Sequence, residues 1–210
     1  MCSSSHGDKD SKVLSYGDVV LYESDVNTLL PGVWLNDNIL SFVCEFLMEN
    51  SSREVKEQVA IVSAASCELI RYAGDASIIR EIFTSLNFFD KEKILFVLND
   101  REDPRVVGGF HWSLLVLDRR AAHFHYYDST RPAKTAVAKQ VVGIVSEFLD
   151  NKDIKFTIED CPQQRNSFDC GMYVIEFIRH VLKVCSYAVY TKNTYRIFWN
   201  CPVYVRGLLS

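Results

Sequence analysis

The residue of this chain best placed for nucleophilic chemistry is Cys170. It follows the polar segment PQQRNSF and stands immediately before a run with the apolar spacing of a helix. A thiol at the first turn of a helix lies at the positive end of the helix dipole, which favours the nucleophilic thiolate form. Most free cysteines are instead small buried apolar residues. Cys44, Cys67 and Cys185 lie within apolar helical patterns and fit that interpretation.

A thiol nucleophile needs a base, and the base needs an orienting acceptor. His111 stands near the start of an expected strand, after the glycine pair Gly108-Gly109, and Asp128 ends the next expected strand. A short hairpin between these strands brings their far ends together and places Asp128 beside His111. A carboxylate in that position fixes the imidazole tautomer and stabilises the imidazolium. Taken singly, each is as readily a half-buried histidine or a turn aspartate.

Gln164 lies six residues before Cys170, in the loop that leads to the helix. A carboxamide there can donate a hydrogen bond to an oxyanion, with the Cys170 backbone N–H as a second donor. Without the other site residues, Gln163 and Gln164 are ordinary loop residues.

The other histidines suggest a metal site only weakly. His123 and His125 share one face of an expected strand, but no cysteine or carboxylate pair at ligand spacing accompanies them. We therefore expect neither a metal nor another cofactor.

The elements that must position these residues follow from hydrophobic periodicity. Helices are expected at 37–49, where Asn36 and Asp37 supply an N-cap, within 54–85 with a break near Gly74, at 133–149 and at 171–182. Strands are expected at 94–98, 110–117, 122–128 and 155–158, and a short strand or turn at 13–21. Helices on both sides of a block of strands predict an α+β fold in one domain.

Composition excludes several classes of protein. The 210 residues carry a net charge of −4, which argues against a general nucleic-acid binder. No apolar run approaches the length of a membrane span. The seven cysteines form no CxxC pair, and an odd number fits no closed disulfide set. A reducing compartment, cytoplasm or nucleus, is expected.

Together these residues carry a specific resemblance. The motifs, in chain order, are Trp34-Leu35-Asn36-Asp37, His111-Trp112-Ser113-Leu114, Tyr127-Asp128-Ser129 and PQQRNSFDCGMYV at 162–174. In order and spacing the chain resembles the ubiquitin-like-protein-specific cysteine protease family, which includes the sentrin/SUMO-specific proteases. Within it the chain most resembles the short deneddylases, which act on the neddylation modifier.

The resemblance implies a papain-like α+β fold with a central mixed sheet flanked by helices. It implies Cys170 as nucleophile, His111 as general base and acid, Asp128 as orienting carboxylate and Gln164 as oxyanion donor. Trp34 and Trp112 would roof a narrow channel that admits the Gly-Gly end of the modifier, since glycine has no Cβ to clash with flat rings. Asn36 and Asp37 would lie at the channel mouth, where Asp37 could pair with a basic residue of the modifier tail.

The resemblance divides the chain into a polar leader at 1–12, a cysteine protease domain at 13–183 and a divergent tail at 184–210. The tail is rich in aromatic and β-branched residues and has little helical character, so it departs from the helical continuation that is usual in the family.

The function expected is a thiol isopeptidase that removes a ubiquitin-like modifier from target lysines and also trims its precursor. The implied partners are the neddylation modifier and its conjugates, such as cullins, with the enzyme acting as a monomer. The same motifs leave open a SUMO-specific protease, and a non-enzymatic alternative is an inactive module that binds the modifier. An acyltransferase with a similar Cys-His-acid set would need an acyl-donor site, and the sequence shows no basic stretch for one.

Overall fold

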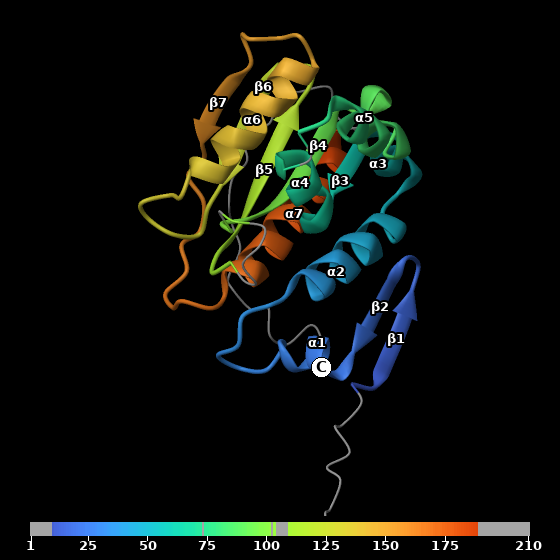
Figure 1. The fold of residues 1–210 in the computed structure, drawn as a ribbon, viewed down its shortest axis with the longest axis vertical. Coiled ribbons are helices and arrows are strands. Elements are labelled where there is room, and N and C mark those ends of the chain that lie inside the picture. The colour runs from blue at the N-terminus through green and yellow to red at the C-terminus, as the bar shows by residue number, and fades with distance from the viewer. Residues whose placement is uncertain (1–9, 73, 102, 104–108, 189–210) are drawn as a thin grey trace, which may run out of the picture.

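A computed structural model describes residues 10–72, 74–101, 103 and 109–188 of the chain (Figure 1). Its centre is a five-stranded sheet in the order β3-β4-β5-β6-β7. The strands are β3 (Val59–Val62), β4 (Lys93–Asn99), β5 (Trp112–Asp118), β6 (His123–Tyr127) and β7 (Lys155–Ile158). The two outer pairs are parallel and the two inner pairs antiparallel. The predicted mixed sheet of an α+β fold is therefore confirmed.

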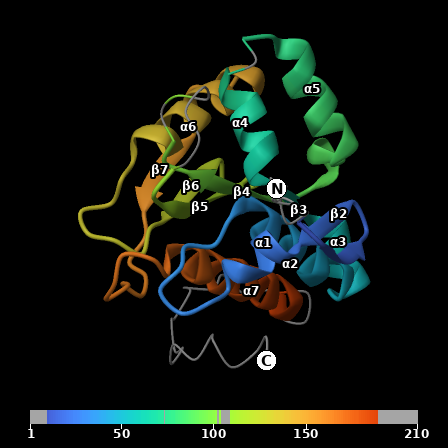
Figure 2. The same cartoon turned by 60° about the horizontal axis from the view of Figure 1, so that its bottom comes forward.

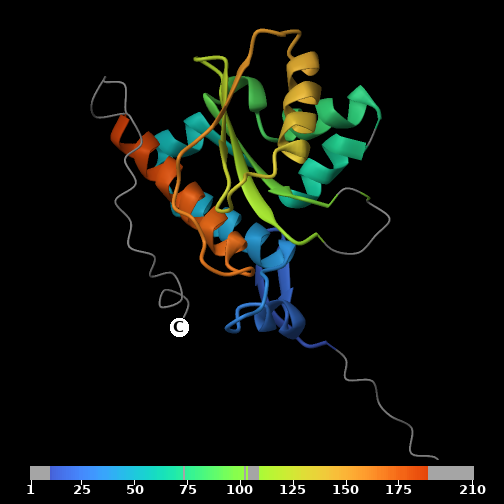
Figure 3. The same cartoon turned by 90° about the vertical axis from the view of Figure 1, so that its left-hand side faces the viewer.

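Helices cover both faces of this sheet. Helices α2 (Asp37–Glu49) and α7 (Cys170–Ala188) lie on one face, and α4 (Ala64–Tyr72), α5 (Ala76–Ser85) and α6 (Ala136–Phe148) lie on the other (Figures 2 and 3). Because both faces are covered, β4 and β5 read as nearly continuous apolar runs. Alternate side chains enter opposite layers: Leu114 packs toward α2 and α7, whereas Leu115 packs toward the other three helices.

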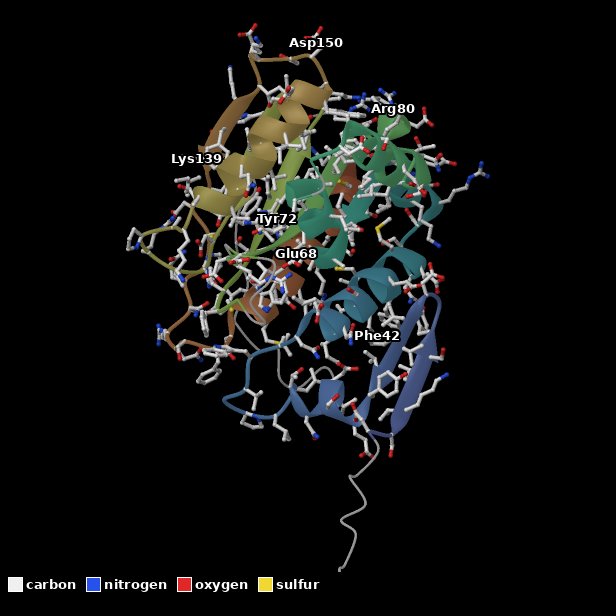
Figure 4. All side chains as sticks on the ribbon, viewed as in Figure 1. Phe42, Glu68, Tyr72, Arg80, Lys139 and Asp150 are labelled. Carbon is white, nitrogen blue, oxygen red and sulfur yellow. The ribbon has the colours of Figure 1, made fainter. Side chains whose placement is uncertain are left out.

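A hairpin and short helices complete the described part of the chain. Strands β1 (Lys12–Tyr16) and β2 (Val19–Tyr22) form the hairpin, and the short helices are α1 (Glu23–Asn27), α3 (Arg53–Gln58) and the 3-10 turn η1 (Phe88–Asp90). Phe42 of α2 points to the hairpin, where its ring meets Tyr16 edge-on at 5.5 Å between centroids (Figure 4). Among the described residues, no helix has both the length and the apolarity to cross a membrane.

Two expected elements differ from the observed ones. Residues 59–62 form strand β3, not part of a helical stretch, because these β-branched and apolar residues pair with β4 along its whole length. Expected strand 110–117 begins only at Trp112, since the β4–β5 ladder ends at the pair Asn99 and Trp112. His111 therefore lies just outside the strand.

Secondary structure continues past both expected domain limits, and the division into domains stays a prediction. Lys12, assigned to the leader, belongs to β1, and Asp10 accepts hydrogen bonds from the backbone and hydroxyl of Ser24. Residues 184–188, assigned to a tail with little helical character, continue α7, because the apolar spacing persists to the buried Cys185. Residues 1–9 and 189–210, together with Gly108, lie outside the described residues.

Candidate active site

The predicted meeting of His111 and Asp128 is present. The β5–β6 hairpin pairs Leu114 with Tyr127, so the residues just beyond this end of the ladder come together. His111 Nε2 lies 2.6 Å from Asp128 Oδ1, and both side chains are buried. A buried carboxylate against one ring nitrogen fixes the tautomer, and leaves Nδ1 for the third member of the site.

Asp128 is prepared for this role by its other partners. Its Oδ1 accepts hydrogen bonds from the backbone N–H and the hydroxyl of Thr130, and its Oδ2 accepts the backbone N–H of Lys134 at 2.8 Å. Burial raises the pKa of Asp128, but the hydrogen bond and charge of His111 and these N–H donors outweigh burial and hold it below its ordinary value. The carboxylate therefore stays ionised although the side chain is fully buried.

Cys170 completes a triad. It is the first residue of α7, and its thiol lies close enough to the His111 imidazole to act on the pKa of that ring. Burial lowers the pKa of His111, but the hydrogen bonds and charges of Asp128 and Cys170 prevail and raise it to about 9. At neutral pH the raised pKa keeps His111 an imidazolium, placed between the Asp128 carboxylate and the Cys170 sulfur, as expected of the base that serves a thiol nucleophile.

Gly171 explains how α7 can begin this close to the loop before α2. A Cβ at Gly171 would lie 3.0 Å from Cβ and 3.2 Å from Cδ1 of Leu35, which is tighter than ordinary contact. The carbonyl of Leu35 in turn accepts the indole N–H of Trp112 at 2.8 Å. Leu35 therefore contacts both the start of α7, at Gly171, and the start of β5, at Trp112. These two contacts set the position of Cys170 relative to β5.

The two predicted channel tryptophans lie in different environments. Trp112 is buried, with 7% of its surface exposed, whereas Trp34 is 44% exposed. The Trp34 indole N–H donates to the Ser167 carbonyl at 2.5 Å, and its ring meets Phe110 edge-on at 5.7 Å. Trp34 thus spans from the residue before His111 to the loop before Cys170.

Gln164 is held close to the triad but has other partners in this structure. Its backbone N–H donates to the carbonyl of Ser129, and its Oε1 accepts the Ser129 hydroxyl at 2.6 Å. Its Nε2 donates to the carbonyl of Asn166 at 2.7 Å. The hydroxyl of Ser129, the residue after Asp128, therefore orients the Gln164 carboxamide. To donate to an oxyanion, the Gln164 N–H₂ group would give up its hydrogen bond to the Asn166 carbonyl.

Two roles are expected of Asn36 and Asp37, a helix cap and a contact with the modifier tail, and the structure shows the first of them at Asn36. Asn36 is the N-cap of α2: its Oδ1 accepts the N–H of Ile39, and its Nδ2 donates to Asp25 at 2.6 Å. Asp37 is exposed, and within the described part of the chain its carboxylate has no hydrogen bond or ion pair. Asp37 is free to meet a ligand, while Asn36 has a structural task.

The remaining histidines and cysteines have other surroundings. His123 is hydrogen-bonded to Thr157 of β7, and His125 to Glu159, the residue after that strand. The described residues hold no cluster of three potential metal ligands. Burial raises the pKa of Cys44 to about 12 and the pKa of Cys161 and Cys185 to about 11, and it also raises that of Cys67.

Sequence reasoning missed several residues of the site. Phe110, the exposed partner of Trp34, and Ser129, the anchor of Gln164, both adjoin predicted residues and could have been found by that adjacency. Thr130 and Lys134 contact Asp128 from the loop after β6, and no spacing pattern announces those contacts.

Comparisons with known proteins agree with this geometry. Residues 33–198 match the family model described as "Ulp1 protease family, C-terminal catalytic domain". Sentrin-specific protease 8 of Homo sapiens is 36% identical over 168 residues, 79% of each chain. NEDD8-specific protease 1 of Arabidopsis thaliana is 33% identical, over 81% of this chain and 75% of that one.

Solved structures show the same fold. The C-terminal Ulp1 protease domain in complex with SMT3, the yeast ortholog of SUMO, superimposes with a TM-score of 0.69 at 20% identity, covering 85% of this chain and 79% of that one. The predicted papain-like α+β architecture is thereby confirmed. The chain belongs to the Ulp1 protease family of cysteine proteases, which its motifs, its fold and its Cys-His-Asp arrangement indicate together.

Proposed function

We propose that this protein is a thiol isopeptidase that cleaves after the C-terminal Gly-Gly of a ubiquitin-like modifier, and that its principal modifier is the neddylation modifier. The observation that carries the proposal is the buried contact of 2.6 Å between His111 and Asp128, beside the Cys170 thiol at the start of α7. It brings together a nucleophile, a base and an orienting acid in the order that acyl transfer requires.

The reaction begins with attack of the Cys170 sulfur on the carbonyl carbon of the modifier's last glycine. The His111 imidazolium gives its proton to the leaving lysine amine, and a thioester remains on Cys170. The backbone N–H of Cys170 and the carboxamide of Gln164 donate to the oxyanion. His111, now neutral, takes a proton from the water that hydrolyses the thioester, which releases the modifier and restores the thiol.

The modifier's tail would reach Cys170 beneath the Trp34 ring. The Trp34 indole is hydrogen-bonded to the Ser167 carbonyl and packs against Phe110. Its ring would therefore cover the path between His111 and Cys170. Two glycines can pass under flat rings where larger side chains would clash. The buried Trp112 would line the channel wall, Asn36 would hold the mouth in shape, and the exposed Asp37 would bind a basic residue of the tail.

The choice of modifier rests on relatives. Two of them, at 36% and 33% identity, carry the names sentrin-specific protease 8 and NEDD8-specific protease 1. The SUMO complex of the Ulp1 domain favours a second candidate, a SUMO-specific protease, but at 20% identity. Cullins as conjugates, a monomeric enzyme and a cytoplasmic or nuclear location stay predictions.

Two electrophile-ended probes test the proposal, one built on the neddylation modifier and one on SUMO. The full chain and the Cys170→Ala variant are incubated with each, and adducts are located by mass spectrometry. We expect an adduct with the first probe alone, on Cys170, and none in the variant. The variant should still bind the modifier, because most of the contact surface lies away from the sulfur.

The other outcomes each exclude part of the proposal. Labelling by the SUMO probe alone would keep the mechanism and replace the substrate. Labelling that survives Cys170→Ala would remove Cys170 as the nucleophile. Labelling by neither probe, on protein that circular dichroism shows to be folded, would favour the inactive binding module.

A further inference from the structure

Asp100 binds the main chain of His111, which lies beyond the last residue pair of the β4–β5 ladder. The β4–β5 ladder ends at Asn99 and Trp112, one residue short of His111. Asp100 takes over there: its N–H donates to the His111 carbonyl at 3.0 Å, and its Oδ1 accepts the N–H groups of Phe110 at 2.7 Å and His111 at 2.9 Å. Both polar groups of the His111 main chain are thus bound by one residue.

The second carboxylate oxygen of Asp100 connects it to the acid of the triad. Asp100 Oδ2 lies 2.9 Å from Lys134 Nζ, and the backbone N–H of Lys134 donates to Asp128 Oδ2 at 2.8 Å. With the contact between His111 and Asp128, these bonds close a ring of four residues. A closed ring restricts the position of base and acid relative to each other, because neither can move without breaking a bond.

The ring is fastened to the fold on the side of β4. Arg101, the next residue, forms an ion pair with Glu68 of α4, and its carbonyl accepts the hydroxyl of Tyr72 at 3.1 Å. Figure 4 shows Glu68 and Tyr72 together on α4. The main chain next to Asp100 is therefore held in place by these contacts with α4.

We propose that Asp100 is a positioning residue that sets His111 against Asp128, and that Lys134 sets the orientation of Asp100. The side chain of Lys134 is 54% exposed, so its ion pair with Asp100 adds little stability by itself. What the pair supplies is geometry, and a misplacement of about 1 Å in a catalytic group can cost about 100-fold in rate. The importance of this geometry for turnover rests on the proposed function, whereas the positioning itself does not.

Titration of the His111 imidazole by NMR tests the positioning without any substrate. The groups whose charges act on His111 are Asp128 and Cys170, and Asp100 acts through the main chain. The pKa of His111 in the full chain is expected near 9. Asp100→Ala should lower it toward the ordinary 6.5, because a displaced imidazole loses its partners. Asp100→Asn keeps an oxygen acceptor for the two N–H groups and should preserve most of the elevation.

Kinetics on the same variants separate positioning from general damage. With a fluorogenic modifier substrate, Asp100→Ala should lower kcat about 10- to 100-fold with KM nearly unchanged, and Asp100→Asn should restore most of it. Asp75→Ala is the matched control, because Asp75 also accepts a backbone N–H, that of Ser77, but lies at the exposed N-cap of α5. It should change neither kcat nor the His111 titration.

An unchanged His111 pKa in Asp100→Ala would overturn the proposal, and so would an Asn variant as impaired as the Ala variant. If Asp100→Ala does not fold, Lys134→Met serves instead. It removes the exposed ammonium but keeps the N–H to Asp128, and it should lower the His111 pKa in the same direction by a smaller amount. No change in that variant would equally reject the ring. A normal titration pattern in protein that cleaves no modifier would reject the proposed function alone.

Discussion

The two faces of the central sheet are built for different tasks. Toward α2 and α7 the buried layer includes Cys170 and Trp112, and the polar side chains of His111 and Asp128 lie just beyond the adjacent ends of β5 and β6. Toward α4, α5 and α6 the layer is mainly apolar, with Phe83 stacked on Phe88 at 4.1 Å between ring centroids and the buried Arg71 hydrogen-bonded to Gln140. We therefore expect changes on the first face to affect catalysis and changes on the second to affect packing. Changes on the two faces should affect different observables.

The largest effect is expected for Asp128→Asn. The carboxamide keeps the shape of the side chain and can still accept from Thr130, but it can present an N–H to His111 and favour the wrong tautomer. We expect turnover to fall by about 10⁴-fold, as for comparable triads. Steady-state cleavage of a fluorogenic modifier substrate measures it. A rate within a few-fold of the wild type would remove Asp128 from the triad.

On the packing face, Phe83→Ala should reduce stability and leave chemistry alone. Phe83 is fully buried between Phe88 and Phe148, and truncation of a buried phenylalanine costs about 3–5 kcal/mol. Urea unfolding measures the loss, and kcat is taken under conditions where the variant is fully folded. A large fall in kcat of the folded variant would break the separation of the two faces.

Gly171→Ala probes the close approach of α7 to the site. The new methyl group would press on Leu35, so the first turn of α7, with Cys170, must shift by a few tenths of an ångström. We expect kcat to fall about 10-fold. Gly143→Ala in α6 is the matched control, since an exposed helical glycine with open space around it should gain about 0.5–1 kcal/mol on substitution and change no rate. Equal rates in both variants would show that the tight contact does not matter.

The pH dependence gives the smallest but most specific effect. Because the pKa of His111 is raised from its ordinary 6.5 to about 9, the imidazolium form stabilises the native protein fully below pH 6.5, and this contribution is lost as the pH rises through 9. The proton that His111 gives to the leaving amine is lost over the same range. We expect kcat/KM to decline near pH 9, and nearer 6.5 in Asp128→Asn. A wild-type decline near 6.5 would contradict the coupled triad.

The parts of the fold and site that sequence predicted are those with a local signal. Helix α2 begins at Asp37 as expected because Asn36 is its cap, and the hairpin geometry brought Asp128 to His111. Strand β3 was missed because four residues of VAIV have no period of their own and depend on pairing with β4. The ring through Lys134 was missed for the same reason, since its contacts are made only in the folded chain.

Cysteine reactivity, resolved by residue, tests the central claim most directly. All five cysteines in the described part of the chain are buried, so exposure cannot distinguish them. Only Cys170 has an imidazolium beside it, whereas burial raises the pKa of Cys44, Cys67, Cys161 and Cys185. With iodoacetamide at pH 7 and peptide-level mass spectrometry, Cys170 should react at least about 10-fold faster than these four, and lose that advantage in His111→Ala. Equal rates for Cys170 and the other four would contradict the account.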